Sequence, residues 1–86
     1  MESLTLEKAL QDNENFMIFL KECPFCYKAE KILKSNKVKF EKFNKDKYKT
    51  LTEEAQNKYS YRTFPLIVLD RKFIGGCSDL SKIFEN

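Results

Sequence analysis

This 86-residue chain contains no histidine, no tryptophan and only three cysteines. The absence of histidine removes the usual general base and the commonest metal ligand in proteins. No apolar run reaches about 18 residues, which argues against a transmembrane helix, and residues 1–15 lack the apolar core of a secretory signal peptide. Three unevenly spaced cysteines do not make the disulfide framework of a small secreted domain. We therefore expect a cytoplasmic protein without a membrane partner.

The composition predicts a single globular domain that spans residues 1–86. Apolar residues make up 42% of the chain, which is too many for a disordered segment, and the net charge is only +3. Nine lysines occur from Lys28 to Lys49, but three acidic residues are interleaved with them. This pattern favours a solvated lysine-rich face over a polyanion site, so we expect no nucleic-acid partner. The alternative function of these lysines is to attract a small anion.

Apolar periodicity predicts an α/β fold with the order β-α-β-α-β-β-α and a possible extra helix at the N-terminus. Continuous or alternating apolar residues predict strands over residues 16–20, 38–43, 66–69 and 72–74. Apolar residues at helical spacing predict helices over residues 3–11, 24–35, 51–59 and 78–84, with Ser78 as the cap of the last one. The first β-α-β unit should be a right-handed parallel crossover, and the last two strands an antiparallel hairpin. The sheet is therefore expected to be mixed, with helices on both faces.

Two cysteines, Cys23 and Cys26, lie where the first predicted strand gives way to a predicted helix. Pro24 suits the first position of that helix, where its missing N–H costs nothing. A sulfur there faces unpaired backbone N–H groups and the positive end of the helix dipole, which stabilise a thiolate. Cysteines at such positions have pKa values of roughly 3.5–7.5 rather than about 8.5. We therefore predict Cys23 as the exposed nucleophile and Cys26 as a more buried resolving thiol, with Lys21 and Lys28 adding positive charge nearby.

Two other interpretations of this cysteine pair are weaker. A zinc site needs four ligands, and beyond the pair the chain offers only Cys77 and no histidine. A closed site would then need carboxylates or a second subunit, so we expect no metal. Two inert core cysteines are possible, but a junction between strand and helix with a proline between the sulfurs favours redox chemistry.

Three segments resemble the signatures of dithiol glutaredoxins, which belong to the thioredoxin-like superfamily. Cys-Pro-Phe-Cys at residues 23–26 is similar to their Cys-Pro-Tyr-Cys active site, and Arg-Thr-Phe-Pro at 62–65 to their Thr-Val-Pro segment. Gly-Gly-Cys-Ser-Asp-Leu at 75–80 matches their Gly-Gly-Cys-Ser/Asp-Asp-Leu signature. The three occur in the family's order, and the resemblance spans about residues 16–86. It implies a thioredoxin-like fold with a central four-stranded mixed sheet flanked by helices, and a cis peptide bond before Pro65.

The resemblance also implies a glutathione-disulfide oxidoreductase. Such an enzyme uses glutathione as co-substrate and reduces protein–glutathione mixed disulfides and protein disulfides, most often as a monomer. By matched positions, the backbone of Phe64 would pair with the cysteinyl part of glutathione, Asp79 and the start of the last helix would receive its γ-glutamyl end, and Lys21 its glycyl carboxylate. The full set of implied glutathione-binding residues is Lys21, Phe25, Arg62, Thr63, Phe64, Pro65, Gly76, Cys77, Ser78 and Asp79. The alternative for Ser78 and Asp79 is a purely structural role as caps of the helix.

Three features depart from the family pattern. Lys21 lies two residues before Cys23, whereas the family places its basic residue three before. Tyr-Ser-Tyr at 59–61 stands where many members carry a glycine, and Phe64 is bulkier than the usual valine. Two alternative functions stay open: a dimeric carrier of a bridging 2Fe-2S cluster, ligated by Cys23 and glutathione, and a redox-inert lysine-rich binding module.

Overall fold

Four strands and four helices make up the computed structural model, which describes residues 4–84. The strands are β1 (Phe16–Phe19), β2 (Glu41–Asn44), β3 (Leu66–Leu69) and β4 (Lys72–Gly75). The helices are α1 (Leu6–Asp12), α2 (Pro24–Ser35), α3 (Lys49–Tyr59) and α4 (Cys77–Phe84). This is the predicted order of elements, and it includes the extra N-terminal helix. None of these helices within residues 4–84 is both long and apolar enough to cross a membrane.

The strands form one mixed sheet in the order β2-β1-β3-β4. β1 pairs with β2 in parallel through the α2 crossover, whereas β3 is antiparallel to both β1 and β4. The β3–β4 turn consists of Asp70 and Arg71, which both have positive φ angles, of 54° and 63°. Two left-handed residues in a two-residue turn match the right-handed twist of a hairpin. The predicted four-stranded mixed sheet is therefore confirmed.

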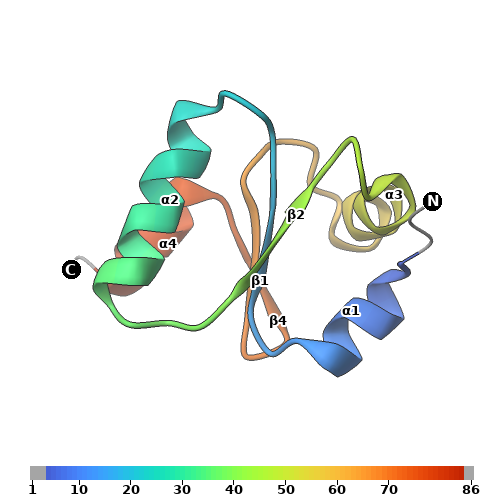
Figure 1. Cartoon of the computed structure of the whole chain (residues 1–86), viewed down its shortest axis with the longest axis horizontal. Helices are drawn as coiled ribbons and strands as arrows, with labels where there is room; N and C mark the ends of the chain where they lie inside the picture. Colours follow the sequence, from blue (N-terminus) through green and yellow to red (C-terminus); the bar gives the residue numbers. More distant parts are fainter. Residues whose placement is uncertain (1–3, 85–86) are drawn as a thin grey trace.

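The central strand β1 is buried because it carries apolar side chains on both faces. Phe16 and Ile18 point into one hydrophobic cluster and Met17 into another, as expected from the alternation of side chains along a strand. The first cluster packs against α1 and α3, and the second against α2 and α4. Figure 1 shows these two helix pairs on opposite sides of the sheet. β1 ends at Phe19 in the middle of the sheet, and the chain enters α2 at Pro24, on the side of the sheet covered by α2 and α4.

Several boundaries differ from the prediction by one to three residues. β2 begins at Glu41 rather than at Val38, because the backbone of Val38 is still bonded to the last turn of α2. The Val38 N–H donates to the Leu33 carbonyl at 3.0 Å, while Lys37 adopts a left-handed conformation with φ of 59°. This is a Schellman ending of a helix with lysine in place of the usual glycine. α1 begins at Leu6 after the capping residue Thr5, whereas residue 3, where the helix was predicted to start, lies outside the described residues.

Candidate active site

The β1–α2 junction places Cys23 at the cap position of α2. Its backbone is extended, and its Sγ accepts a hydrogen bond from the Cys26 N–H at 3.2 Å. Pro24 occupies the first turn of the helix, as predicted. The sulfur therefore takes the place that a serine or aspartate oxygen takes in ordinary helix caps, and it lies at the positive end of the helix dipole.

The two sulfur-bearing residues differ in exposure in the predicted order. Cys23 is 8% exposed and Cys26 is 2% exposed. The prediction of an exposed nucleophile is nevertheless wrong in degree, because Cys23 is largely covered. Its side chain turns back over the first turn of α2 to accept the Cys26 amide, and this directs the sulfur toward the protein. Cys23 therefore presents little surface to a substrate disulfide.

The environment of Cys26 keeps its thiol protonated. Burial is the main cause that raises the pKa of Cys26 from 9.0 to about 12. The hydrogen bond to Cys23 and the negative charges of Cys23 and Cys77 raise it further, and a backbone hydrogen bond at Leu20 acts in the opposite direction. The two thiols are thus chemically different: Cys26 holds its proton, and Cys23 accepts hydrogen bonds.

The connection between β1 and Cys23 is short and contains one residue with an unusual backbone conformation. Glu22 adopts a left-handed conformation with φ of 57°, which is uncommon for a residue other than glycine. Lys21, the preceding residue, is exposed and does not line the groove described next. The one-residue shortening noted in the sequence therefore coincides with a strained turn and with a lysine outside the groove.

A groove of about 390 Å³ lies beside the start of α2. It runs between the segment before β3 and the start of α4. The peptide bond between Phe64 and Pro65 is cis, as predicted. The groove is lined by Phe25, Tyr61, Thr63, Phe64, Pro65, Gly76, Cys77 and Ser78.

The start of α4 is built by Asp79 rather than by Ser78. The helix begins at Cys77, ahead of Ser78, and the Asp79 Oδ2 accepts a hydrogen bond from the Gly76 N–H at 3.1 Å. Asp79 can cap the helix because its carboxylate lies in the first turn and reaches back to the N–H of Gly76, the residue just before the helix. The prediction of Ser78 as the cap is wrong, and Ser78 is instead an exposed residue of the groove.

Gly76 lies against the end of the Tyr61 side chain, which a larger residue would have to displace. A Cβ atom at this position would overlap the Tyr61 hydroxyl oxygen and would lie 3.4 Å from the Pro65 carbonyl oxygen. The backbone of Gly76 therefore approaches the groove closely because it carries no side chain.

The structure brings together seven of the ten residues implied for glutathione binding. Arg62 is exposed outside the groove, as is Lys21, and Asp79 stands behind the lining at the helix start. Tyr61 lines the groove but was not singled out from the sequence as a site residue. The available signal was its place next to Arg62 and Thr63, in the stretch where family members more often carry glycine.

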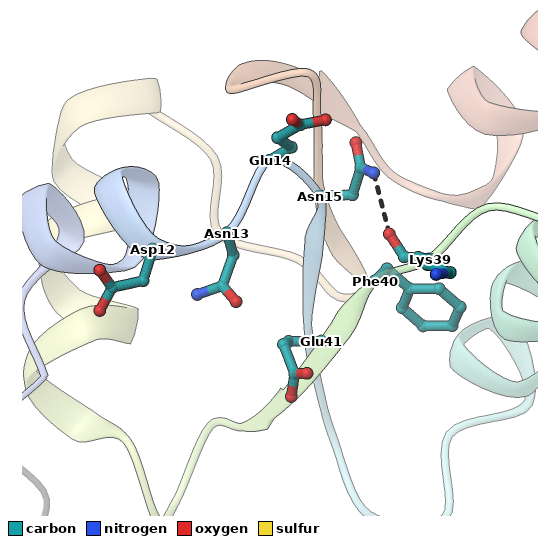
Figure 2. Close-up of a pocket in the computed structure, with 7 residues that line it drawn as sticks. All are labelled: Asp12, Asn13, Glu14, Asn15, Lys39, Phe40 and Glu41. Atoms are coloured by element: carbon teal, nitrogen blue, oxygen red, sulfur yellow. Dashed lines mark hydrogen bonds between the residues drawn. The ribbon is translucent and has the colours of Figure 1, made fainter.

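A second hollow, of about 340 Å³, lies at the opposite end of β1 (Figure 2). It contains the carboxylates of Asp12, Glu14 and Glu41 and is braced by Asn15, whose Nδ2 donates to the Lys39 carbonyl at 2.9 Å. The three carboxylates point apart, and no group of three or more acidic, cysteine or histidine residues within residues 4–84 is placed to hold a metal ion. The three cysteines lie away from this hollow, at the other end of β1.

Comparison with known proteins decides the family. A sequence profile of the glutaredoxin family matches residues 15–74. The chain belongs to the glutaredoxin family. It is 37% identical over 67 residues to glutaredoxin 3 of Escherichia coli, an alignment that covers 77% of this chain and 81% of that protein. It is 30% identical over 84 residues to glutaredoxin-1 of Rhizophagus irregularis, with 94% of this chain and 83% of that protein covered.

Solved glutaredoxin structures share the fold. A dithiolic glutaredoxin from Trypanosoma brucei brucei superposes with a TM-score of 0.81 at 29% identity, over 93% of this chain and 86% of that one. A buckwheat glutaredoxin, solved in complex with glutathione, superposes with a TM-score of 0.78 at 20% identity, over 90% of this chain and 76% of that one. The thioredoxin-like fold is therefore confirmed, and membership of the family makes this glutaredoxin a thiol–disulfide oxidoreductase.

Proposed function

We propose that this glutaredoxin reduces protein–glutathione mixed disulfides with Cys23 as nucleophile and glutathione as reductant. The observation that carries the proposal is the position of the Cys23 sulfur. It caps α2 and accepts the Cys26 amide at 3.2 Å, beside a groove large enough for a short peptide. Backbone N–H groups and the helix dipole stabilise negative charge at this position, and the thiolate is the nucleophile in disulfide exchange.

The first step is thiol–disulfide exchange. The Cys23 thiolate attacks the glutathione sulfur of the mixed disulfide, a new Cys23–glutathione bond forms, and the protein sulfur leaves as a thiolate that takes a proton from solvent. A second glutathione thiolate then attacks the sulfur of the bound glutathione. This step releases oxidised glutathione and restores the Cys23 thiolate. The net reaction consumes one free glutathione, which leaves as a disulfide with the glutathione taken from the substrate.

Protein disulfides follow a second route through Cys26. Attack by Cys23 joins the enzyme to one sulfur of the substrate and frees the other. Cys26 then loses its proton and attacks Cys23, which releases the reduced substrate and leaves a Cys23–Cys26 disulfide. The high pKa of Cys26 supports this division of labour, because a protonated thiol does not compete with Cys23 in the first step.

The groove supports glutathione as the reductant. Thr63 and Phe64 line the groove just before β3, and their backbone would offer hydrogen-bonding groups to a peptide laid alongside, as an added strand would use them. The start of α4 suits the α-carboxylate of the γ-glutamyl end, and the Asp79 carboxylate suits its ammonium group. Phe25 and Pro65 form apolar parts of the lining. Arg62 and Lys21 lie outside it, so we propose them only as flanking charges.

The test is a glutathione-coupled assay with a small glutathione mixed disulfide and with a protein disulfide. We expect Cys23→Ser to lose both activities. The matched variant Cys26→Ser should keep turnover of the mixed disulfide and lose turnover of the protein disulfide. If Cys26→Ser were inactive toward the mixed disulfide while Cys23→Ser remained active, the two roles would be assigned the wrong way round.

A further inference from the structure

Exposed aromatic side chains gather next to the nucleophile. Within residues 4–84, three large apolar side chains are strongly exposed: Phe25 at 64%, Tyr27 at 59% and Ile83 at 48%. Two of the three lie in the first turn of α2, within four residues of Cys23. Aromatic residues are enriched in the buried centres of protein–protein interfaces and depleted elsewhere on surfaces. The surface around the nucleophile therefore has the composition of a contact site.

Positive charge continues from these aromatics along α2. Lys28 and Lys31 are exposed and three residues apart, so they project from the same side of the helix and together line a hollow of about 350 Å³. Lys21 is exposed in the turn before Cys23. None of these three lysines forms an ion pair with another residue in the part of the chain that the structure describes. Their charges are therefore available to a partner.

Few carboxylates oppose this positive charge. Glu30 is already held by Lys34 and Lys42, each with an Nζ–Oε2 distance of 3.0 Å. The first turn of α2 contains no acidic residue. Glu22, exposed in the preceding turn, is the nearest carboxylate in the sequence that no lysine pairs with, and one negative charge does not cancel three positive ones.

We propose that Lys21, Phe25, Tyr27, Lys28 and Lys31 form a docking face for an acidic segment of a substrate protein next to its disulfide. The inference rests on the proposed function, because it concerns the protein that delivers the disulfide to Cys23. Phe25 and Tyr27 supply apolar contact area, and the three lysines attract carboxylates on either side of the substrate cysteine. Complementary charge of this kind mainly raises the association rate and selects among partners.

A protein partner fits this face better than a nucleic acid. The face begins beside Cys23 and continues along α2, and the reaction proposed for that sulfur needs a disulfide, which nucleic acids do not carry. The lysines are also few, whereas tight nucleic-acid binding neutralises many phosphates at once. The chemistry at the centre of the face therefore favours a polypeptide.

The test compares two synthetic peptides with the same glutathionylated cysteine, one flanked by aspartates and glutamates and the other by lysines. We expect the wild-type protein to show a higher kcat/KM for the acidic peptide at about 20 mM salt, and a smaller preference at about 200 mM. In the K28E/K31E variant, the ratio of the two kcat/KM values should fall by about 5-fold or more. The ratio cancels any effect on the thiol itself, because both peptides carry the same reacting disulfide.

The control variant K58E/K72E changes the net charge equally at exposed lysines of α3 and β4, and we expect it to keep the wild-type ratio. Equal kcat/KM values for the two peptides in the wild-type protein, or an equal fall of the ratio in both variants, would overturn the docking face. So would inhibition by a single-stranded oligonucleotide at lower concentration than by an acidic peptide without cysteine, which would assign the face to nucleic acid. Failure to turn over either peptide or the small mixed disulfide would instead refute the proposed function.

Discussion

The proton on Cys26 gives the sharpest test of the site. With a pKa of about 12, only about one Cys26 thiol in 10⁵ is ionised at neutral pH, against about one in 10² for a thiol with a pKa of 9.0. Alkylating agents react with the thiolate, so Cys26 should react about 10³-fold more slowly than an ordinary thiol through ionisation alone. Its burial slows the reaction further.

The measurement is the rate of iodoacetamide labelling at each cysteine, followed by mass spectrometry of peptides between about pH 7 and pH 10. In the wild-type protein, we expect the labelling rate of Cys26 to rise tenfold per pH unit throughout this range. Steric protection lowers the rate at every pH equally and does not change this slope. A plateau of the Cys26 rate near pH 9 would therefore refute the reasoning, whatever the absolute rate.

The same assay on the Cys23→Ala variant separates the causes of the raised pKa. Burial, the largest cause, persists in this variant, whereas the hydrogen bond to Cys23 and its negative charge are lost. The labelling rate of Cys26 should rise but stay below that of the unfolded protein. The Cys26→Ala variant should also lose a part of the alkaline sensitivity. Because the unfolded thiol ionises near pH 9 and the folded one near pH 12, this thiol lowers the stability of the wild-type protein as the pH rises between them.

Three further substitutions test the groove and the packing around it. Gly76→Ala should lower the free energy of unfolding by about 1–3 kcal/mol, because the new Cβ overlaps the Tyr61 hydroxyl. The same variant should bind glutathione more weakly in titration calorimetry. In a Tyr61→Phe background, much of both losses should be recovered. Asp79→Asn keeps an acceptor for the Gly76 N–H, so it should raise the KM for glutathione without lowering the melting temperature, whereas Asp79→Ala should cost about 1 kcal/mol of stability as well. Burial alone would raise the pKa of Glu30, but two lysine hydrogen bonds outweigh it and lower the pKa below 4.5. Its contribution to stability is therefore present above about pH 4.5 and lost on acidification, and melting curves of Glu30→Gln should show less of this acid loss.

The sequence was most informative where one strong physical preference acted alone. The five apolar residues that begin at Phe16 predict a strand covered on both faces, and the structure confirms it in β1. Pro24 predicts the start of a helix because its ring fixes a helical φ and its missing N–H would be unpaired there anyway. Both predictions concern the junction that carries Cys23. For that reason the position of Cys23 at the start of the helix could be predicted before its surroundings were known.

Sequence reasoning failed where tertiary contacts fixed a backbone that residue type does not favour. Glu22, Lys37 and Ser60 all have left-handed φ angles, of 57°, 59° and 51°, at positions where glycine would be the expected signal. Ser60 ends α3 and turns the chain so that Tyr61 enters the groove. The only sequence signal for Tyr61 as a site residue was therefore its place next to Arg62 and Thr63. The partial covering of Cys23 was likewise invisible, because it depends on the direction of one side chain.

The arrangement of the two sulfurs also sets the order of events at the site. The hydrogen bond to Cys23 and the negative charge that Cys23 carries when ionised both raise the pKa of Cys26. Formation of a mixed disulfide at Cys23 removes that charge, so two of the causes that raise the pKa of Cys26 disappear or weaken at the moment when Cys26 is needed as a nucleophile. The resolving thiol is thus activated by the intermediate that it resolves. Burial, the largest cause of the raised pKa of Cys26, persists in that intermediate, so the proposed function still leaves Cys26 the slower of the two thiols to ionise.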